Sequence, residues 1–304
     1  MANAPSAPHL GAMLRKLVSR IPGLRRLSDR KPVVPVLRLN GAIGQGGALR
    51  SGLTAGALAE PIRRAFTTSG AKAVALLVNS PGGSPVQSEL IASRIRQYAQ
   101  EKDLKVYVFC EDVAASGGYW LACAGDEIYA SKASIVGSIG VVAAGFGFQD
   151  LIARYGVERR VYTSGEKKVI LDPFQQEDPD DVARLKEIQA EIHEHFKAMV
   201  RDRRKGKLQA EESELFSGAF WTGEQAYQLG LIDGIGELRQ TLRGKYGTKV
   251  EMPLIEPQRS WLKRKLGGGA ALGGLLTGGD GAGSWAGDLL SAAEERALWS
   301  RYGL

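Results

Sequence analysis

The feature of this 304-residue sequence that most constrains its fold is a series of short apolar runs, each followed by a glycine- or serine-rich turn. The runs at 72–78 and 105–110 are almost continuously apolar, which is typical of strands buried on both faces of a parallel sheet. Between them, segment 85–101 has apolar residues at three- and four-residue steps, which predicts a helix. Strands that alternate with helices in this way predict an α/β domain with parallel strand pairing.

The same alternation continues in both directions along the chain. Further strands are expected at 33–39, 127–130, 139–142 and 159–162, and further helices at 54–67, 116–124, 149–155 and 179–205. The helix at 179–205 has the most regular apolar stripe in the chain. We therefore divide the chain into a leader at 1–31, a central α/β domain at 32–250 and a tail at 251–304.

The net charge of +7 is concentrated in the leader, where seven Lys and Arg residues against Asp29 give 7 − 1 = +6. A nucleic-acid interface would spread such residues over a folded face, so no nucleic-acid partner is expected. Within the leader, residues 13–21 place apolar side chains on one helical stripe opposite the cations. This pattern fits either a helix lying in a membrane surface, with peripheral contact through residues 13–27, or a solvated disordered leader.

No segment has the pattern of a membrane-spanning helix or a cleavable signal, so a location in the cytoplasm or at the periphery of the inner membrane is expected. The tail has ten glycines between Gly267 and Gly287. This composition indicates a flexible or partner-dependent segment, with a short helix near 289–299.

The scarcity of histidine and cysteine excludes several kinds of catalytic site. The two cysteines form no CxxC or Cys/His cluster, and two of the three histidines, His193 and His195, are predicted to be surface residues of one helix. No zinc ligand set and no Ser-His-Asp triad can be assembled from these residues. We therefore expect neither a metal nor an organic cofactor.

Three short segments can carry chemistry. Ser116 lies in a small-residue cluster that follows a predicted strand and opens a helix, where it is either a nucleophile or only a helix N-cap. Gly82 and Gly83 can expose backbone N–H groups as an anion-binding nest, although Pro-Gly-Gly is also an ordinary turn. Lys167 and Lys168 follow Ser116 by about fifty residues, and a desolvated lysine can activate a serine where no histidine is available.

Five stretches carry a family resemblance: VNSPGGS (78–84), AASGGYW (114–120), VGSIG (136–140), SGEKK (164–168) and FWTGEQAYQLGLIDGIG (220–236). Through them, residues 33–247 resemble the signal peptide peptidase A family of serine peptidases in its short, single-repeat form. That family is distantly similar to the Clp protease proteolytic subunit. The resemblance implies a crotonase/Clp-protease-like superhelix of repeated β-β-α units with a helical C-terminal extension. The family pattern includes an N-terminal membrane span, which we do not find in this sequence.

The resemblance also implies roles for individual residues. Ser116 becomes the nucleophile and Lys168 the general base, so that Lys167 is a solvated neighbour. The backbone N–H groups of Gly83, or Gly82, and of Gly117 form the oxyanion hole. In short-form members the serine and the lysine meet across a subunit boundary within a homo-oligomeric ring.

Ser138 is expected, by the same resemblance, to orient the lysine. The implied function is endoproteolysis of peptides with apolar side chains, such as signal-peptide remnants or membrane-protein fragments. Two alternatives remain: a crotonase-type acyl-CoA enzyme that uses the same oxyanion hole, and a catalytically silent scaffold at a membrane surface.

Overall fold

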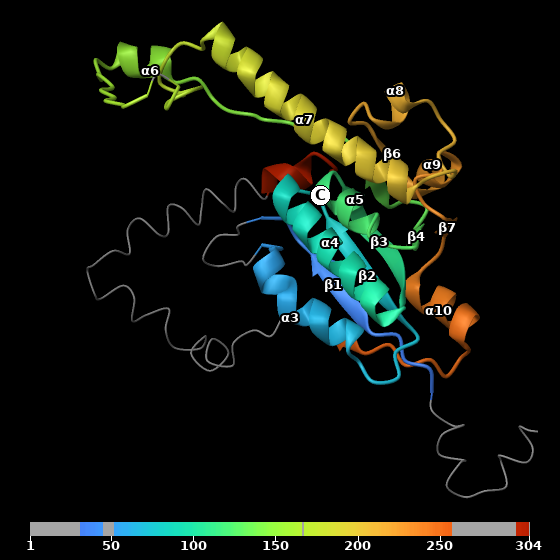
Figure 1. The fold of residues 1–304 in the computed structure, drawn as a ribbon. Helices are drawn as coiled ribbons and strands as arrows, with labels where there is room; N and C mark the ends of the chain where they lie inside the picture. Colours follow the sequence, from blue (N-terminus) through green and yellow to red (C-terminus); the bar gives the residue numbers. More distant parts are fainter. Residues whose placement is uncertain (1–30, 45–51, 166, 257–295, 304) are drawn as a thin grey trace, which may run out of the picture.

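The computed structural model describes residues 31–44, 52–165, 167–256 and 296–303, and its centre is a largely parallel β-sheet (Figure 1). Four parallel strands lie side by side in the order β3, β2, β1, β8. Their bounds are Val36–Asn40 (β1), Ala73–Ser80 (β2), Lys105–Ala115 (β3) and Leu254–Ile255 (β8). The predicted apolar runs form β1, β2 and the first part of β3, and most side chains of β2 and β3 are buried, whereas β8 is not among the predicted strands.

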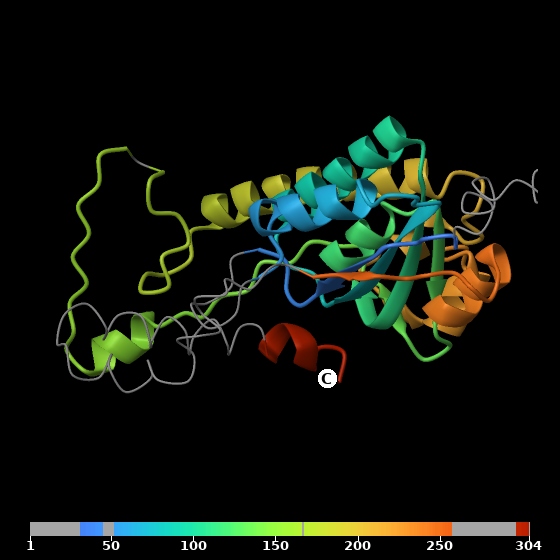
Figure 2. The ribbon, with the colours of Figure 1, turned by 90° about the horizontal axis from the view of Figure 1, so that it is seen from below.

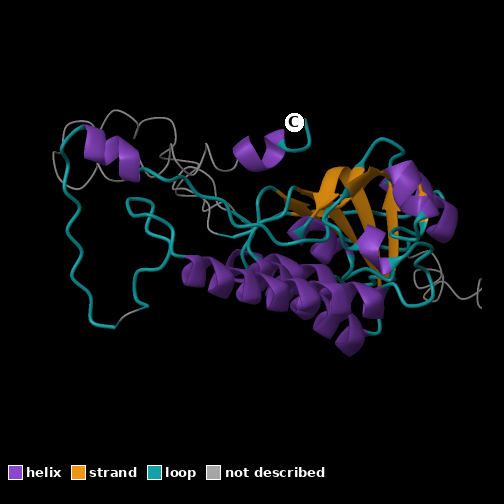
Figure 3. Ribbon diagram, turned by 90° about the horizontal axis from the view of Figure 1, so that it is seen from above, coloured by secondary structure: helices purple, strands orange, loops and turns teal. Residues whose placement is uncertain are grey.

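Helices α3 (Ala55–Phe66), α4 (Pro85–Lys102) and α5 (Gly117–Ala122) cover one face of this sheet (Figure 3). Side-chain caps fix where the first two begin: Thr54 accepts from the N–H of Ala57, and Ser84 accepts from the N–H of Gln87. The main core lies between these helices and the sheet. Helix α10 (Leu238–Tyr246) packs on the opposite face over a second, smaller core.

Strand β3 pairs with different partners along its length. Its first half pairs with β4 (Glu127–Ala130), and its last three residues pair with β5 (Ile135–Gly137). β5 continues the sheet through the antiparallel strand β6 (Phe220–Thr222), whereas β4 pairs with β7 (Gly234–Ile235). The carboxyl end of β3 therefore lies between β2 and β5, and the sheet has the α/β architecture that the sequence predicts.

Residues 143–178, which we call the arm, leave the body of the molecule and return at the start of α7 (Figure 2). The arm contains one short helix, α6 (Gln149–Arg154), none of whose residues is buried. Helix α7 (Pro179–Arg203) then runs back across the body, and near its carboxyl end Phe196 and Val200 are buried. Two short helices, α8 (Glu212–Leu215) and α9 (Gly223–Gln228), follow it.

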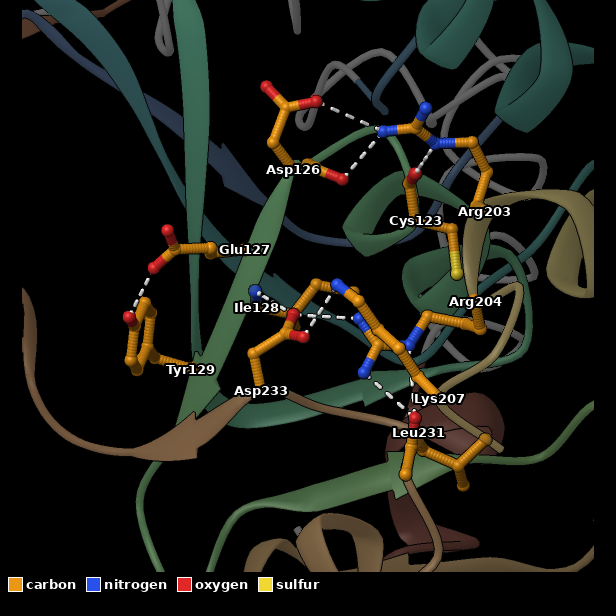
Figure 4. A network of polar contacts seen from close by, with 12 residues as sticks. Cys123, Asp126, Glu127, Ile128, Tyr129, Arg203, Arg204, Lys207, Leu231 and Asp233 are labelled. Atoms are coloured by element: carbon orange, nitrogen blue, oxygen red, sulfur yellow. Dashed lines mark hydrogen bonds and ion pairs between the residues drawn. The ribbon is translucent and has the colours of Figure 1, made fainter. Parts of the chain in front are cut away.

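A buried ion-pair network anchors the segment after α7 to the body (Figure 4). Arg204, whose side chain is 2% exposed, donates to Asp233 at 2.7 Å and to the Gly230 carbonyl through two nitrogens. Asp233 also accepts from Lys207 and from the Ile128 N–H of β4. The network thus ties the end of α7 and the loop before β7 to one strand of the sheet.

Two of the strands predicted from the sequence are not found in the structure. The expected strand at 139–142 is instead irregular chain directly after β5, and the expected strand at 159–162 is exposed coil in the arm. The leader to residue 30 and tail residues 257–295 lie outside the described residues; the described end of the tail holds a helical turn at 296–300. Across the described ranges, no helix combines the length and apolar character that crossing a bilayer requires.

Candidate active site

Ser116 stands at the junction between β3 and α5 in a backbone conformation that is rare for any residue except glycine (φ 53°, ψ −123°). Its N–H donates to the Gly137 carbonyl at 2.8 Å, and its carbonyl accepts from Trp120 at 3.0 Å. The side chain is half-buried, and its hydroxyl caps no helix N–H. Ser116 therefore occupies the N-cap position of α5 without capping the helix through its side chain, and both of its backbone groups hold the turn.

The glycines around Ser116 allow α5 to lie directly against β2. A Cβ at Gly118 would lie 2.3 Å from the Ser80 carbonyl oxygen, and one at Gly82 would lie 2.8 Å from the Ser116 Cβ. Larger residues at either position would push α5 away from the sheet. The small-residue cluster in the sequence therefore has a packing role as well as a place in the site.

The backbones of Gly83 and Gly117 lie close together beside Ser116. The Gly83 nitrogen lies 3.4 Å from the position that a Gly117 Cβ would occupy. Within the described ranges, neither N–H donates to a backbone acceptor. The Gly82 N–H differs because it already donates to Ser80 Oγ at 3.3 Å. Of the two candidates that the sequence offers, Gly83 is therefore the one whose N–H has no acceptor among the described residues.

Ser138 follows β5 at a second position of left-handed backbone, with φ 52°. The register of β3 on β5 pairs Ala115 with Gly137, so the next residues, Ser116 and Ser138, emerge side by side. The Ser138 N–H donates to the Ala219 carbonyl at 2.7 Å, which fixes the turn from the other side. The fold thus brings together Ser116, Ser138, Gly83 and Gly117.

The two lysines of the SGEKK segment lie in the arm, and Lys168 is exposed and forms no hydrogen bond with Ser116. Lys167 donates to Asp181 at the start of α7 at 3.1 Å. This hydrogen bond, together with the attraction of the carboxylate, raises the pKa of Lys167. The structure of one chain therefore places neither lysine in hydrogen-bond contact with Ser116.

The sequence missed one side chain that reaches this region. His193 of α7 is half-buried, and its Nε2 lies 3.1 Å from the carbonyl oxygen of Ile139, the residue after Ser138. His195 is exposed, as expected for both histidines. His193 precedes Phe196 by three residues, so both lie on one face of α7, and Phe196 stacks on Trp120 of α5 with ring centroids 4.7 Å apart. The three-residue spacing between His193 and Phe196 is the sequence signal that could have placed His193 on the buried face of α7.

The remaining groups give no competing site. Burial raises the pKa of Cys110 to about 12 and that of Cys123 to about 11, so both thiols stay neutral and are poor nucleophiles. Among the residues that the structure describes, no cluster of His, Cys, Asp or Glu could hold a metal ion.

Comparisons with known proteins identify the family of this chain. A family profile described as "Peptidase family S49" matches residues 98–247. A putative protease of Synechocystis is 34% identical over 71% of this chain and 82% of its own length. A sequence of Brucella abortus named as a Na(+)/H(+) antiporter is 52% identical over 97% of this chain, which spans only 39% of that protein.

Among solved structures, a membrane-bound stomatin-specific protease in complex with a substrate peptide matches with 16% identity and a TM-score of 0.47. The match covers 75% of this chain and 94% of that one. The sequence matches identify the family independently of this structural likeness. From the 34% identity to a relative covered over most of its length, and from the matching family profile, we conclude that this chain belongs to peptidase family S49.

Proposed function

We propose that the chain is a serine endopeptidase in which Ser116 is the nucleophile and Lys168, supplied by a neighbouring copy of the chain, is the general base. The backbone of Ser116 carries the proposal. Ser116 is held at φ 53° between β3 and α5, and the nearby N–H groups of Gly83 and Gly117 have no backbone acceptor within the described ranges. Strained backbone conformations of this kind cluster at functional sites, which supports an active role for Ser116.

The contact of Lys167 with Asp181 favours Lys168 as the base. A lysine accepts a proton only in its neutral form, and the ion pair with Asp181 holds Lys167 in its charged form. The Lys168 side chain makes no hydrogen bond or ion pair with a described residue and is exposed at the outside of the arm. It is therefore available to enter the site of another molecule.

The apolar surface of the arm supports assembly with further copies. Phe146 and Tyr162 are 80% and 90% exposed. The apolar side chains of α7 that precede Phe196 are only half-buried. Exposed apolar side chains that gather in one patch mark a surface that contacts another protein. A heterologous interface, repeated until the rotation closes, would cover the arm and produce a ring.

The proposed reaction proceeds in two stages. Lys168 takes the proton of the Ser116 hydroxyl as its oxygen bonds to the peptide carbonyl carbon, and the N–H groups of Gly83 and Gly117 stabilise the oxyanion. The protonated lysine then gives its proton to the leaving amine as the C–N bond breaks. A water attacks the resulting ester, with the lysine again as base, and releases the acid and the free serine.

Exposed apolar residues beside the oxyanion segment support apolar peptides as substrates. Val86 and Leu90 lie on the first turns of α4, directly after Gly83, and are 61% and 48% exposed. They are spaced four residues apart and so present one apolar face next to the proposed scissile bond. Signal-peptide remnants and membrane-protein fragments have side chains that suit such a surface.

Labelling with a fluorophosphonate, together with cleavage of an apolar fluorogenic peptide, tests the proposal. We expect Ser116→Ala to abolish both labelling and cleavage, and Lys168→Ala to lower cleavage by at least about a thousandfold. Lys167→Ala is the matched control and should keep most of the activity. A wild-type chain that neither labels nor cleaves would identify a silent scaffold, whereas an active Lys168→Ala with an inactive Lys167→Ala would assign the base to Lys167.

Peripheral membrane contact through residues 13–27 remains part of the proposal, and these residues lie outside the described ranges. The concentration of positive charge in the leader predicts binding to anionic vesicles that weakens with salt. Flotation with vesicles containing phosphatidylserine decides this point. Equal flotation with and without residues 1–31 would exclude the leader as the contact.

A further inference from the structure

We propose that His193 is a positioning residue of the Ser116 site, which acts by holding the turn that carries Ser138. The inference rests on the proposed function, because Ser138 matters for activity only if a lysine must be oriented there. The observation behind it is the contact of His193 Nε2 with the Ile139 carbonyl oxygen at 3.1 Å. No other described side chain forms a hydrogen bond with residues 137–140.

The direction of this hydrogen bond follows from its partners. A carbonyl oxygen only accepts, so Nε2 must carry the hydrogen in this contact. The ring is half-buried, and its helix is fixed one turn further on by the stack of Phe196 on Trp120. The imidazole is therefore a fixed donor on a rigid support.

The turn is also held from the opposite side by β6 and the residues before it. The Ala219 carbonyl accepts from the Ser138 N–H at 2.7 Å. Gly137 lies so close to Trp221 that a Cβ there would meet the indole ring at 2.6 Å. Residues 137–139 are thus held by contacts with β6, with Ala219 before it and with His193 of α7.

The turn at residues 137–139 needs such support because its backbone is strained and because it is hydrogen-bonded to Ser116. Ser138 has φ 52°, a conformation that a non-glycine residue keeps only when its surroundings impose it. The residue before it, Gly137, accepts from the Ser116 N–H at 2.8 Å, so the turn holds Ser138 next to Ser116. When the lysine comes from another copy, its partner Ser138 must already be in place as it arrives.

Three variants test this role in the full-length chain: His193→Leu, His193→Gln and, as a matched control on the same helix, His195→Leu. We expect His193→Leu to lower kcat for a fluorogenic apolar peptide about five- to tenfold, the effect of one lost hydrogen bond, with KM nearly unchanged. His193→Gln keeps an N–H donor and should recover most of the loss. His195→Leu should behave as wild type.

A double-mutant cycle separates positioning from a general structural role. If His193 acts through Ser138, adding His193→Leu to Ser138→Ala should lower kcat by less than twofold beyond the Ser138→Ala effect alone. Full additivity of the two losses would overturn the inference. So would a His193→Gln variant that has the melting temperature of wild type but the low kcat of His193→Leu.

The proposed function fails separately from this inference. A wild-type chain that shows neither fluorophosphonate labelling nor cleavage overturns the peptidase proposal, and the role of His193 falls with it. An active wild type with equally active His193→Leu overturns only the role of His193. If His193→Leu does not fold, the comparison of His193→Gln with His193→Asn, which has a shorter reach, replaces it; equal kcat in these two variants would contradict the inference.

Discussion

At the scale of single residues, Ser116 is held in a backbone conformation that lowers the stability of the fold. A non-glycine residue at φ 53°, ψ −123° is held there by the hydrogen bonds with Gly137 and Trp120 and by the packing of the neighbouring glycines. Conformations of this kind cost about 1–3 kcal/mol and persist where the surrounding structure imposes them. Ser116 is therefore a position where activity and stability oppose each other.

The strain at Ser116 predicts that two inactive variants differ in stability. We expect Ser116→Gly to be more stable than Ser116→Ala by about 1 kcal/mol, because glycine adopts this conformation without strain. Urea unfolding measures the difference. Ser93, which is exposed in the middle of α4, is the control, since there alanine should be more stable than glycine. The same order at both positions would show that the Ser116 backbone is unstrained.

The pH dependence of cleavage separates a lysine base from a histidine base. A lysine acts only when neutral, so the rate should keep rising as the pH increases above about 7, whereas a histidine-dependent rate levels off once imidazole, with its pKa near 6.5, is neutral. Cleavage of one fluorogenic peptide from pH 5 to 10 gives the profile. A rate that is already constant from pH 6 upward would exclude a lysine that titrates above that pH in the free enzyme.

Some residues of this site can be identified from the sequence and others cannot. The difference depends on whether their contacts are local or join segments far apart in the chain. Ser116 and Gly83 lie in segments whose small residues and strand-to-helix position are visible locally. That Ser138 lies beside Ser116 depends on the register of β3 with β5, and the contact of His193 depends on how α7 packs over α5. Neither arrangement is encoded in a local pattern, because both arise from long-range pairing.

At the scale of elements, the predicted strands and helices that pack in the core are confirmed, and the errors lie where the chain leaves it. The α4 prediction of 85–101 compares with Pro85–Lys102, and the strand at 127–130 is found without change. Residues 139–142 and 159–162 have strand-like composition, yet no strand that the structure describes pairs with them. A strand forms only with a partner, so composition alone cannot decide such segments.

The Arg204–Asp233 network predicts that replacing Asp233 lowers the free energy of unfolding strongly. Asp233→Ala leaves the buried Arg204 guanidinium without its carboxylate and should cost about 3 kcal/mol. Glu187→Ala is the matched control, because its ion pair with Arg184 on α7 is more than 60% exposed on both sides and should contribute at most about 0.5 kcal/mol. Urea unfolding compares the two variants, and equal losses would show that the Arg204 pair adds nothing through its burial.

The same network predicts how stability changes with pH. Burial would raise the pKa of Asp233, but the hydrogen bonds from Arg204 and Lys207 outweigh burial, and the pKa is lowered. A lowered pKa in the folded state stabilises the fold above the ordinary aspartate value of about 3.9, and this contribution disappears as the pH falls further. The stability difference between wild type and Asp233→Asn should therefore be constant from pH 7 to 5 and shrink below about pH 4. A difference that grows on acidification would contradict the lowered pKa.

At the scale of the whole molecule, the arm separates the two halves of the proposed dyad. Ser116 lies in the compact body, whereas Lys168 lies in a segment that extends away from it (Figure 2). An arm whose large apolar side chains are exposed is suited to lie against another copy of the chain. A complete site would then belong to a pair of neighbours in the assembly.

Mixing two inactive variants tests this arrangement. Ser116→Ala and Lys168→Ala chains, unfolded together and refolded in equal amounts, should recover activity, because about a quarter of heterologous interfaces would join an intact serine to an intact lysine. Each variant refolded alone is the control. No recovery in mixtures that co-assemble on a sizing column, or full activity of a wild-type monomer, would show that each chain contains its own complete site.

The two attachments of the arm also determine what happens when the arm is cut. Its residues enter from β5 and leave into α7, whose far end is fixed by the Phe196–Trp120 stack and the Arg204–Asp233 pair. A nick by trypsin between residues 143 and 178 would therefore yield two fragments that remain associated until a denaturant separates them. Trypsin would cut readily in a dilute, separated chain and slowly wherever a neighbour covers the arm. The rate of this single scission on a denaturing gel would then report the extent of assembly without any substrate.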